Sequence, residues 1–523
     1  MKNRSLARFL ALSMALVLSA CGGSPDQLSG NWAPAVDQAP MYGYMADAAE
    51  PAGMPQELPQ VEHNTEEYNH ITENPFLSAQ TSPLSTFAAD VDTASYANVR
   101  RMLLSGDDVP ADAVRVEEFI NYFHYDYPQP DGDAPFGVST ELAACPWNED
   151  TMLLRIGLQA TEPDWNAMPR SNLVFLIDVS GSMYDADKLP LVKRAFAMLC
   201  ENLRAEDVIS VVTYADGDAV ILEGASGGEP LAIQSAIEAL EAGGSTNGSQ
   251  GIQRAYELAQ KHFIQGGNNR VILATDGDLN VGVTSEGALT DLIEEKKESG
   301  VFLSVMGFGM GNLKDNKMEA LADHGNGNYA YIDSALEARR VLVEEMGGTL
   351  FTVAKDVKFQ VEFNPATVKG YRLIGYENRL MAAEDFADDT KDGGELGAGH
   401  RVTALYELAS VDSAMDIPGV DLKYQTSQPT DSGEWCTVKI RYKAPDGEES
   451  RLLEYPVAGE PGQMGRNTAL AACAAQFGML LRDSAYKGTA TYAGVLEQLE
   501  AIAGIHDDPY TDELCYLVRR MVR

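Results

Sequence analysis

Basic residues are scarce in this chain of 523 residues, in which 39 Lys and Arg stand against 78 Asp and Glu and give a formal net charge of −39. So acidic a surface repels phosphate backbones, which argues against nucleic-acid binding. Long apolar runs are also rare, because no segment beyond the N-terminus is long and apolar enough to cross a bilayer. Hydrophobic residues still make up 45% of the chain, which is enough for several buried cores.

The common cysteine and histidine motifs of redox and zinc sites are missing as well. The six cysteines form no Cys-x-x-Cys, and the seven histidines form no His-Glu-x-x-His. The glycine-rich segment 307–311 lacks the spacing of a dinucleotide-binding loop. We expect no enzyme, and most cysteines after the first to be buried as small apolar residues. The sequence leaves open whether two of these cysteines form a disulfide.

The N-terminus carries a targeting pattern. Lys2, Arg4 and Arg8 precede the short apolar run 9–18, which predicts a secretory signal peptide over residues 1–20. The next residues resemble the processing box of bacterial lipoproteins, which implies cleavage before Cys21 and lipidation of its thiol. We therefore expect a protein held outside the cytoplasm, in the bacterial envelope, with only its lipid anchor in the membrane.

Composition and element patterns divide the rest of the chain. Residues 21–73 have no Lys or Arg and scattered Pro and Gly, which predicts a disordered acidic tether. Three folded regions and a tail are expected after it: a helical region with the first sandwich strands (74–170), an α/β domain (171–347), a β-sandwich (348–460) and a helical segment (461–523).

The central region alternates strands with helices, which is typical of a mostly parallel α/β sheet. Its strands are expected at 172–178, 207–214, 218–223, 269–275, 301–307 and 328–332. Asp216 and Gly217 between the second and third strands predict a hairpin, and hence one antiparallel edge strand in a sheet of six. Strand patterns on both sides, at 136–160 and 355–457, indicate that this domain is inserted in a β-sandwich.

Five oxygen-bearing side chains lie in loops that follow a strand or precede a helix of this domain: Asp178, Ser180, Ser182, Thr246 and Asp276. In a parallel sheet such loops meet at one edge. Carboxylates and hydroxyls are hard donors, and Mg²⁺ usually keeps positions for water or outside ligands. The pattern predicts that the domain binds something through a metal ion.

These five residues, in this order and spacing, resemble the metal-ion-dependent adhesion site of von Willebrand factor type A domains, which have a Rossmann-like fold. The resemblance covers about residues 170–346. It implies that Ser180, Ser182 and Thr246 bind Mg²⁺ directly, with Mn²⁺ or Ca²⁺ as alternatives, and that Asp178 and Asp276 act directly or through water. It also implies a protein partner that completes the coordination with an Asp or Glu carboxylate.

Segments outside the domain resemble a narrower family. Residues 85–96 and 115–123 are similar to the N-terminal region of bacterial von Willebrand A lipoproteins, and 476–482 to their uncharacterised C-terminal domain. The resemblance implies an envelope-anchored adhesion or scaffold protein. Two alternatives stay open: a metal-assisted hydrolase, in which the same metal would work with a general base, and a structural module whose metal only stabilises loops.

One further acidic cluster precedes a predicted helix. The segment 90–95 also resembles a set of oxygen ligands, but Asp92 or Thr93 as a helix cap explains it more simply. The helix would carry Tyr96 and Val99 on its apolar face and end at Gly106.

Overall fold

The computed structural model describes residues 66–132, 134–162, 164, 168–245, 248–277, 286–297, 299–311, 313–419, 432–445 and 447–522. The predicted signal peptide, Cys21, most of the predicted tether and Thr246 lie outside these ranges. No helix within them combines the length and apolar content needed to cross a bilayer.

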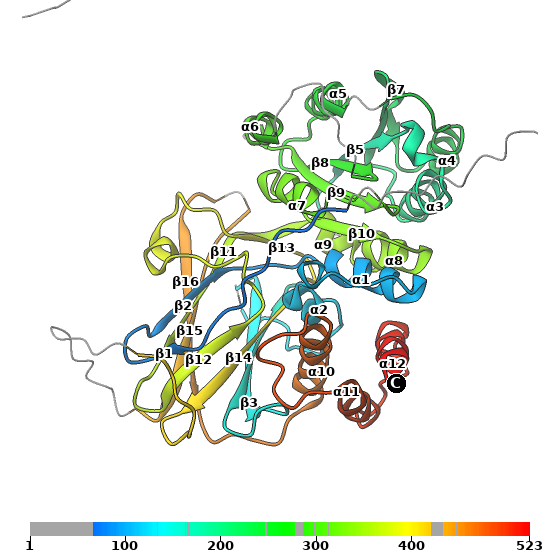
Figure 1. Ribbon diagram of the computed structural model, residues 1–523. Coiled ribbons are helices and arrows are strands. Elements are labelled where there is room, and N and C mark those ends of the chain that lie inside the picture. The colour runs from blue at the N-terminus through cyan, green and yellow to red at the C-terminus, as the bar shows by residue number, and fades with distance from the viewer. Residues whose placement is uncertain are drawn as a thin grey trace, which may run out of the picture. The chain divides into compact units, whose positions relative to one another are not determined.

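A six-stranded sheet lies at the centre of the α/β domain (Figure 1). Its strands, in spatial order, are β10 (Tyr329–Ile332), β9 (Phe302–Phe308), β8 (Asn268–Thr275), β5 (Ser171–Asp178), β6 (Val208–Tyr214) and β7 (Asp218–Ser226). All neighbours are parallel except β7, which pairs with β6 in the antiparallel sense. The predicted sheet, including its antiparallel edge strand, is confirmed.

Helices cover both faces of this sheet, so its central strands are buried on both sides. Along β5, Phe175 faces one apolar core and Val174 the other. The first core is closed by α3 (Leu189–Cys200), α4 (Pro230–Glu238), α8 (Ala335–Arg339), a π-helical turn (Arg340–Glu344) and α9 (Met346–Leu350). The second is closed by α5 (Gly248–Lys261), α6 (Glu286–Lys297) and α7 (Asp315–His324).

Two further sheets enclose a third apolar core and form the expected sandwich. One has the order β1 (Leu77–Ser78), β12 (Val368–Ile374), β14 (Arg401–Ser410), β4 (Met152–Ala160) and β3 (Phe136–Ala144). The other has β13 (Gly394–Gly397), β11 (Thr352–Phe363), β15 (Glu434–Lys443) and β16 (Ser450–Ala458), with β2 (Leu84–Ala88) also paired to β11. The α/β domain enters the chain between β4 and β11, so it is an insertion in the sandwich.

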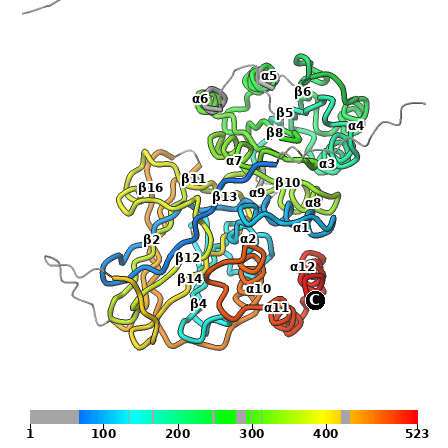
Figure 2. Tube along the Cα trace, viewed as in Figure 1, coloured from blue at the N-terminus to red at the C-terminus, as the bar shows by residue number. Residues whose placement is uncertain are grey.

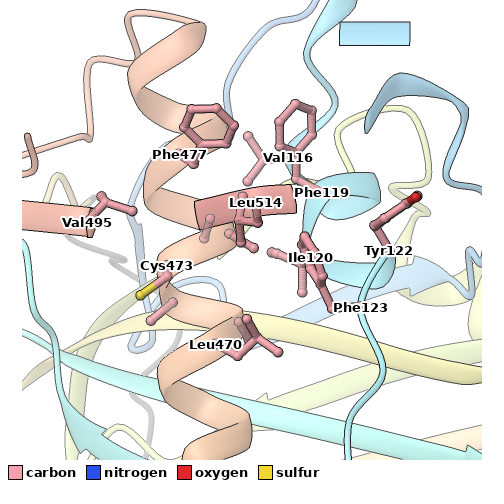
Figure 3. Close-up of a cluster of buried hydrophobic side chains, with 14 of the residues drawn as sticks. Val116, Phe119, Ile120, Tyr122, Phe123, Leu470, Cys473, Phe477, Val495 and Leu514 are labelled. Atoms are coloured by element: carbon pink, nitrogen blue, oxygen red, sulfur yellow. The ribbon is translucent and has the colours of Figure 1, made fainter. Parts of the chain in front are cut away.

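The remaining helices come from the N-terminal and C-terminal parts of the described chain and lie side by side (Figure 2). They are α1 (Ala94–Ser105), α2 (Val116–Asn121), α10 (Arg466–Leu481), α11 (Tyr492–Glu500) and α12 (Pro509–Met521). Phe119 of α2 meets Phe477 of α10 edge-on, with 6.1 Å between ring centroids. Leu514 of α12 belongs to the same buried cluster, shown in Figure 3. The N-terminal and C-terminal helices therefore share one core.

The start of α1 differs from the prediction. Thr93 occupies the N-cap, but the structure shows no side-chain cap hydrogen bond there. Asp92 Oδ1 instead accepts a hydrogen bond from the backbone N–H of Tyr329 at 3.1 Å, and Thr93 Oγ1 accepts one from Arg340 at 2.5 Å. The side-chain oxygens of Asp92 and Thr93 thus accept hydrogen bonds from residues far away in the sequence and not from the first turn of the helix, so the capping prediction was wrong. The helix does end at Gly106, whose φ of 82° is left-handed.

The cysteines behave as predicted. All five in the described ranges are buried free thiols: Cys145, Cys200, Cys436, Cys473 and Cys515. Burial raises the thiol pKa of Cys145, Cys200, Cys436 and Cys473 to about 12. They act as small apolar residues of the cores.

Candidate metal centre

Asp178 stands at the carboxyl end of β5 and is fully buried. The backbone N–H of Ser180 donates to its Oδ1 at 2.9 Å, and the hydroxyls of Tyr214 and Thr275 each donate to its Oδ2 at 3.1 Å. Burial raises the pKa of Asp178 to about 6, the nearby carboxylate of Asp276 adds to this, and hydrogen bonds from Ser180 and Tyr214 oppose it. The carboxylate is thus held in one orientation by the ends of three neighbouring strands.

The two serines come next: Ser180 is the N-cap of a short 3-10 turn, η2 (Gly181–Tyr184), and Ser182 lies within that turn. Their hydroxyl oxygens lie 3.0 Å apart, with Ser180 buried and Ser182 exposed. Met183 anchors the turn, because its side chain lies in the core and its N–H bonds the carbonyl of Ser180 at 3.0 Å. The turn therefore presents one hydroxyl from within the protein and one from the solvent side.

The loop that carries Thr246 approaches this turn. Gly181 N–H donates to the carbonyl of Gly244 at 3.0 Å, and Gly243 N–H donates to that of Val179 at 2.8 Å. Ser245 is tied to Asp216, whose Oδ1 accepts its backbone N–H at 2.6 Å. Thr246 itself lies outside the described residues, so its predicted role stays a prediction. The residues just before it lie beside the serine turn.

Asp276 directly follows β8 and is fully buried. Its Oδ2 accepts a hydrogen bond from the ammonium of Lys188 at 3.1 Å, and the Lys188 side chain is only 7% exposed. Lys188 directly precedes α3 and was not among the predicted site residues, because nothing in the sequence distinguishes it from an ordinary residue at the start of a helix. Tyr214 and Thr275 were also missed, although their places at the ends of β6 and β8 were a usable signal.

The donor set suits a hard divalent cation. The structure brings together two buried carboxylates and two hydroxyls, the oxygen ligands that Mg²⁺ accepts. An ammonium against Asp276 shows that a cation is tolerated beside these carboxylates. Within the described ranges no group of three His, Cys, Asp or Glu side chains is placed to hold a metal. A cation held at this edge would therefore need the serine hydroxyls among its ligands.

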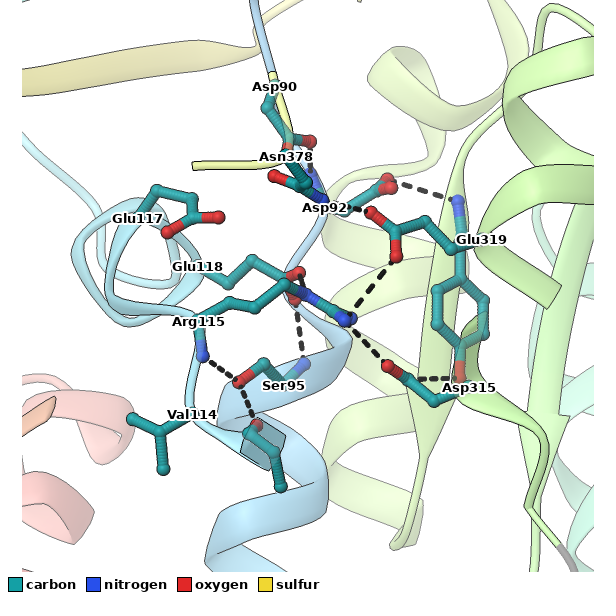
Figure 4. Close-up of polar contacts among 12 residues, drawn as sticks. Asp90, Asp92, Ser95, Val114, Arg115, Glu117, Glu118, Asp315, Glu319 and Asn378 are labelled. Atoms are coloured by element: carbon teal, nitrogen blue, oxygen red, sulfur yellow. Dashed lines mark hydrogen bonds and ion pairs between the residues drawn. The ribbon is translucent and has the colours of Figure 1, made fainter. Parts of the chain in front are cut away.

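The second acidic cluster is occupied by arginine side chains. Arg379 pairs with Asp90 at 3.1 Å and with Asp92 at 3.4 Å, so these carboxylates neutralise a guanidinium. Figure 4 shows the neighbouring ion pairs of Arg115. We assign this cluster a structural role.

Arg115 connects the N-terminal helical region to the α/β domain. Its guanidinium lies 2.7 Å from Asp315 and 3.4 Å from Glu319, both of α7, and it also pairs with Glu118 of α2. Burial raises the pKa of Glu118 to about 7, against the opposing effect of Arg115. Arg100 makes a similar link, from α1 to Asp333 and to Glu513 of α12.

Three family models match consecutive parts of the chain. The model for von Willebrand factor matches residues 62–155, the von Willebrand factor type A domain matches 172–345, and the C-terminal domain of uncharacterized protein YfbK matches 348–523. The type A match contains all five predicted metal ligands, Asp178, Ser180, Ser182, Thr246 and Asp276.

Individual relatives cover different shares of the chain. Uncharacterized protein YfbK of Escherichia coli (strain K12) is 42% identical over 467 residues, or 87% of this chain and 80% of that protein. Inter-alpha-trypsin inhibitor heavy chain H3 of Mesocricetus auratus is 25% identical over 192 residues, or 35% of this chain and 21% of that protein. A solved von Willebrand factor type A structure from Catenulispora acidiphila aligns with a TM-score of 0.42 and 18% identity, over 77% of this chain and 99% of that chain.

Proposed function

Because this chain belongs to the family of bacterial von Willebrand factor type A proteins that includes YfbK, we propose that it is an envelope-anchored protein that binds a partner through a divalent cation. A type A domain points to a protein-interaction or adhesion module. The observation that carries the metal dependence is the convergence of Asp178, Ser180, Ser182 and Asp276 at one edge of the sheet.

The proposed ligands of the cation are the two serine hydroxyls, Thr246 and the two carboxylates. Their charge is what makes the site suited to binding a partner. Hydroxyls are neutral, so two carboxylates balance a divalent cation, and the site carries no surplus of negative charge to repel an anion. A bound cation supplies a coordination position and positive charge for a carboxylate from outside. We therefore propose a partner that presents an Asp or Glu side chain.

Residues of the chain keep the rest of the site in place. Tyr214 and Thr275 orient the Asp178 carboxylate, and the buried Met183 fixes the turn that carries the serines. A site whose ligands are already oriented loses little conformational entropy when it binds, which favours affinity. Asp216 holds the third loop through Ser245 in the same way.

The proposed location depends on the N-terminus. The last residues of the predicted tether, 66–73, belong to the folded part, because Glu66 pairs with Arg101 and Glu73 with Arg482. Lipidation at Cys21 would fix the chain to a membrane, and residues 21–65 would separate the folded part from it. A flexible segment of that length spans about 40 Å on average. The binding edge of the α/β domain would then be free to meet partners in the envelope.

Affinity capture tests the proposal. The full-length chain is used to capture envelope proteins in Mg²⁺, in EDTA, and as the Asp178→Asn variant in Mg²⁺, with Glu201→Gln as a matched control. Glu201 is exposed and directly follows α3, so its variant removes one charge without touching the site. We expect the captured partner to be lost in EDTA and in Asp178→Asn, and kept in Glu201→Gln.

The other outcomes separate the alternatives. The same partner in all samples would contradict a metal bridge and favour a structural module. Turnover of ester, peptide or phosphate substrates that disappears in Asp178→Asn would favour the metal-assisted hydrolase instead.

A further inference from the structure

Lys188 is the only lysine in the described residues that the structure pairs with Asp276. Its backbone is fixed at the start of α3, because its carbonyl accepts the N–H groups of Leu191 at 2.8 Å and Val192 at 2.9 Å. Its side chain runs inward and is only 7% exposed. A buried ammonium at a predicted metal ligand is costly unless a carboxylate compensates it, and Asp276 does so.

The path of the lysine stem is shaped by a glycine. A side-chain carbon added at Gly309 would lie 2.3 Å from Cγ, 2.8 Å from Cδ and 2.4 Å from Cε of Lys188. Gly309 follows β9 and has a φ of +76°, a conformation that favours glycine. Only a residue without a side chain at position 309 therefore leaves room for the Lys188 stem where it runs toward Asp276.

We propose that Lys188 is a built-in counter-cation of the metal centre, which neutralises Asp276 when no divalent cation is bound and competes with that cation for the carboxylate. This inference rests on the proposed function, since it concerns the same site. Two effects follow from the charge. The metal-free protein is stabilised, because its two buried carboxylates are not left uncompensated. The affinity for a divalent cation is lowered, because the cation meets a positive charge and must share Asp276.

The competition also tunes the site for its partner. With the ammonium retained, the two carboxylates no longer balance all the positive charge of a bound cation and of Lys188. The excess favours an anion from outside over a neutral ligand. Lys188 thereby lowers the affinity of the site for the metal ion and raises its affinity for an acidic partner.

The test measures cation affinity directly. Titration of Mn²⁺ and Mg²⁺ into the full-length chain, by calorimetry and by the Mn²⁺ spin-resonance signal, is compared for the wild type, Lys188→Met and Lys193→Met. Lys193 lies on the same helix and bonds only a backbone carbonyl in the described residues, that of Glu238, so it is a matched charge control. We expect Lys188→Met to bind both cations at least about tenfold more tightly, and Lys193→Met to bind them as the wild type does.

A second variant displaces the lysine without removing it. Gly309→Ala places a methyl group on the lysine stem, and we expect its cation affinity to rise in the same direction. In thermal melts, Lys188→Met should unfold at a lower temperature than the wild type without metal, and should gain more from saturating Mg²⁺. A Lys188→Met chain that folds only with the cation would support the proposal equally.

Two results would overturn it. One is a Lys188→Met protein whose cation affinity is unchanged or weaker; the other is one that stays unfolded at saturating cation, which would make Lys188 a purely structural residue. Failure here is distinguishable from failure of the proposed function. If the wild type binds no divalent cation, both the proposed function and the role of Lys188 are contradicted. If the wild type binds the cation and Lys188→Met binds it with the same affinity, only the role of Lys188 is contradicted. Tighter cation binding in Lys188→Met alongside capture of the partner in EDTA would contradict only the bridge.

Discussion

Substitution of Arg115 by Met tests whether buried ion pairs join the α/β domain to the N-terminal helical region. The change would leave Glu118 and Asp315, whose side chains are 0% and 2% exposed, without this guanidinium. Glu319 is affected less, because Arg379 and Asn378 still contact it. Removal of one partner of a buried ion pair typically costs about 3–5 kcal/mol, and we expect a loss in that range at pH 8.

The loss should depend on pH in a defined direction. The pKa of Glu118 is raised to about 7 in the folded protein, above its usual value near 4.5. Its contribution to stability is therefore full below about pH 4.5 and is lost as pH rises through 7. Without Arg115 its pKa rises further, since the guanidinium opposes the shift. The variant should thus lose less relative to wild type at pH 5, where the carboxyl can take up a proton.

Denaturant unfolding of the full-length chain at pH 5 and pH 8, followed by circular dichroism, provides the measurement. Arg519→Met is the matched control, because Arg519 pairs with Glu500 at the surface, where the two side chains are 55% and 41% exposed. We expect the control to lose little stability at either pH, because solvent screens an exposed ion pair. An Arg115→Met loss as small as the control's, or one that is equal at both pH values, would refute the reasoning.

Three further predictions concern the cores and close contacts. Phe477→Ala should cost about 3–5 kcal/mol in denaturant unfolding, since it empties the core shared by α2 and α10, while Phe477→Leu should cost clearly less; equal losses would contradict this. Gly394→Ala should lower the melting temperature, because the added carbon would lie 1.9 Å from the carbonyl oxygen of Ala89, and an unchanged melt would show that β13 moves freely. The five buried thiols should resist a thiol reagent until denaturant is added, and rapid labelling in the native protein would contradict their burial: Cys145, Cys200, Cys436, Cys473 and Cys515.

Much of the fold could be predicted from sequence because its central sheet is built from strong local signals. The strand predicted at 172–178 is β5, and that at 269–275 is β8, each within one residue at its start. Each of these strands contains a continuous apolar run followed by a polar residue, as is typical of a buried parallel sheet. By contrast, β1 and β13 were missed. They have two and four residues, and β13 contains two glycines, so their pairing comes from tertiary contacts.

The candidate site shows the same division. Asp178 and Asp276 could be found because each stands at the carboxyl end of a strand, and the serines because they share a motif with Asp178. Lys188 could not be found, because its relation to Asp276 depends on how the loop after β9 leaves space beside Gly309. The capping role predicted for Asp92 was wrong for a similar reason, since its true donor, Tyr329, is 237 residues away.

The pairing of distant segments has a consequence for the order of folding. Arg100 meets Glu513 across 413 residues of chain, and β2 pairs with β11 on the far side of the inserted domain. The helices and strands of the inserted domain, in contrast, follow one another closely along the chain. Contacts of high sequence separation form slowly, and domains generally fold as units during synthesis. The α/β domain can therefore complete its sheet early, while residues 84–160 keep apolar surfaces exposed until the last helices arrive. We therefore expect chains truncated before α10 to aggregate, because these apolar surfaces would stay exposed.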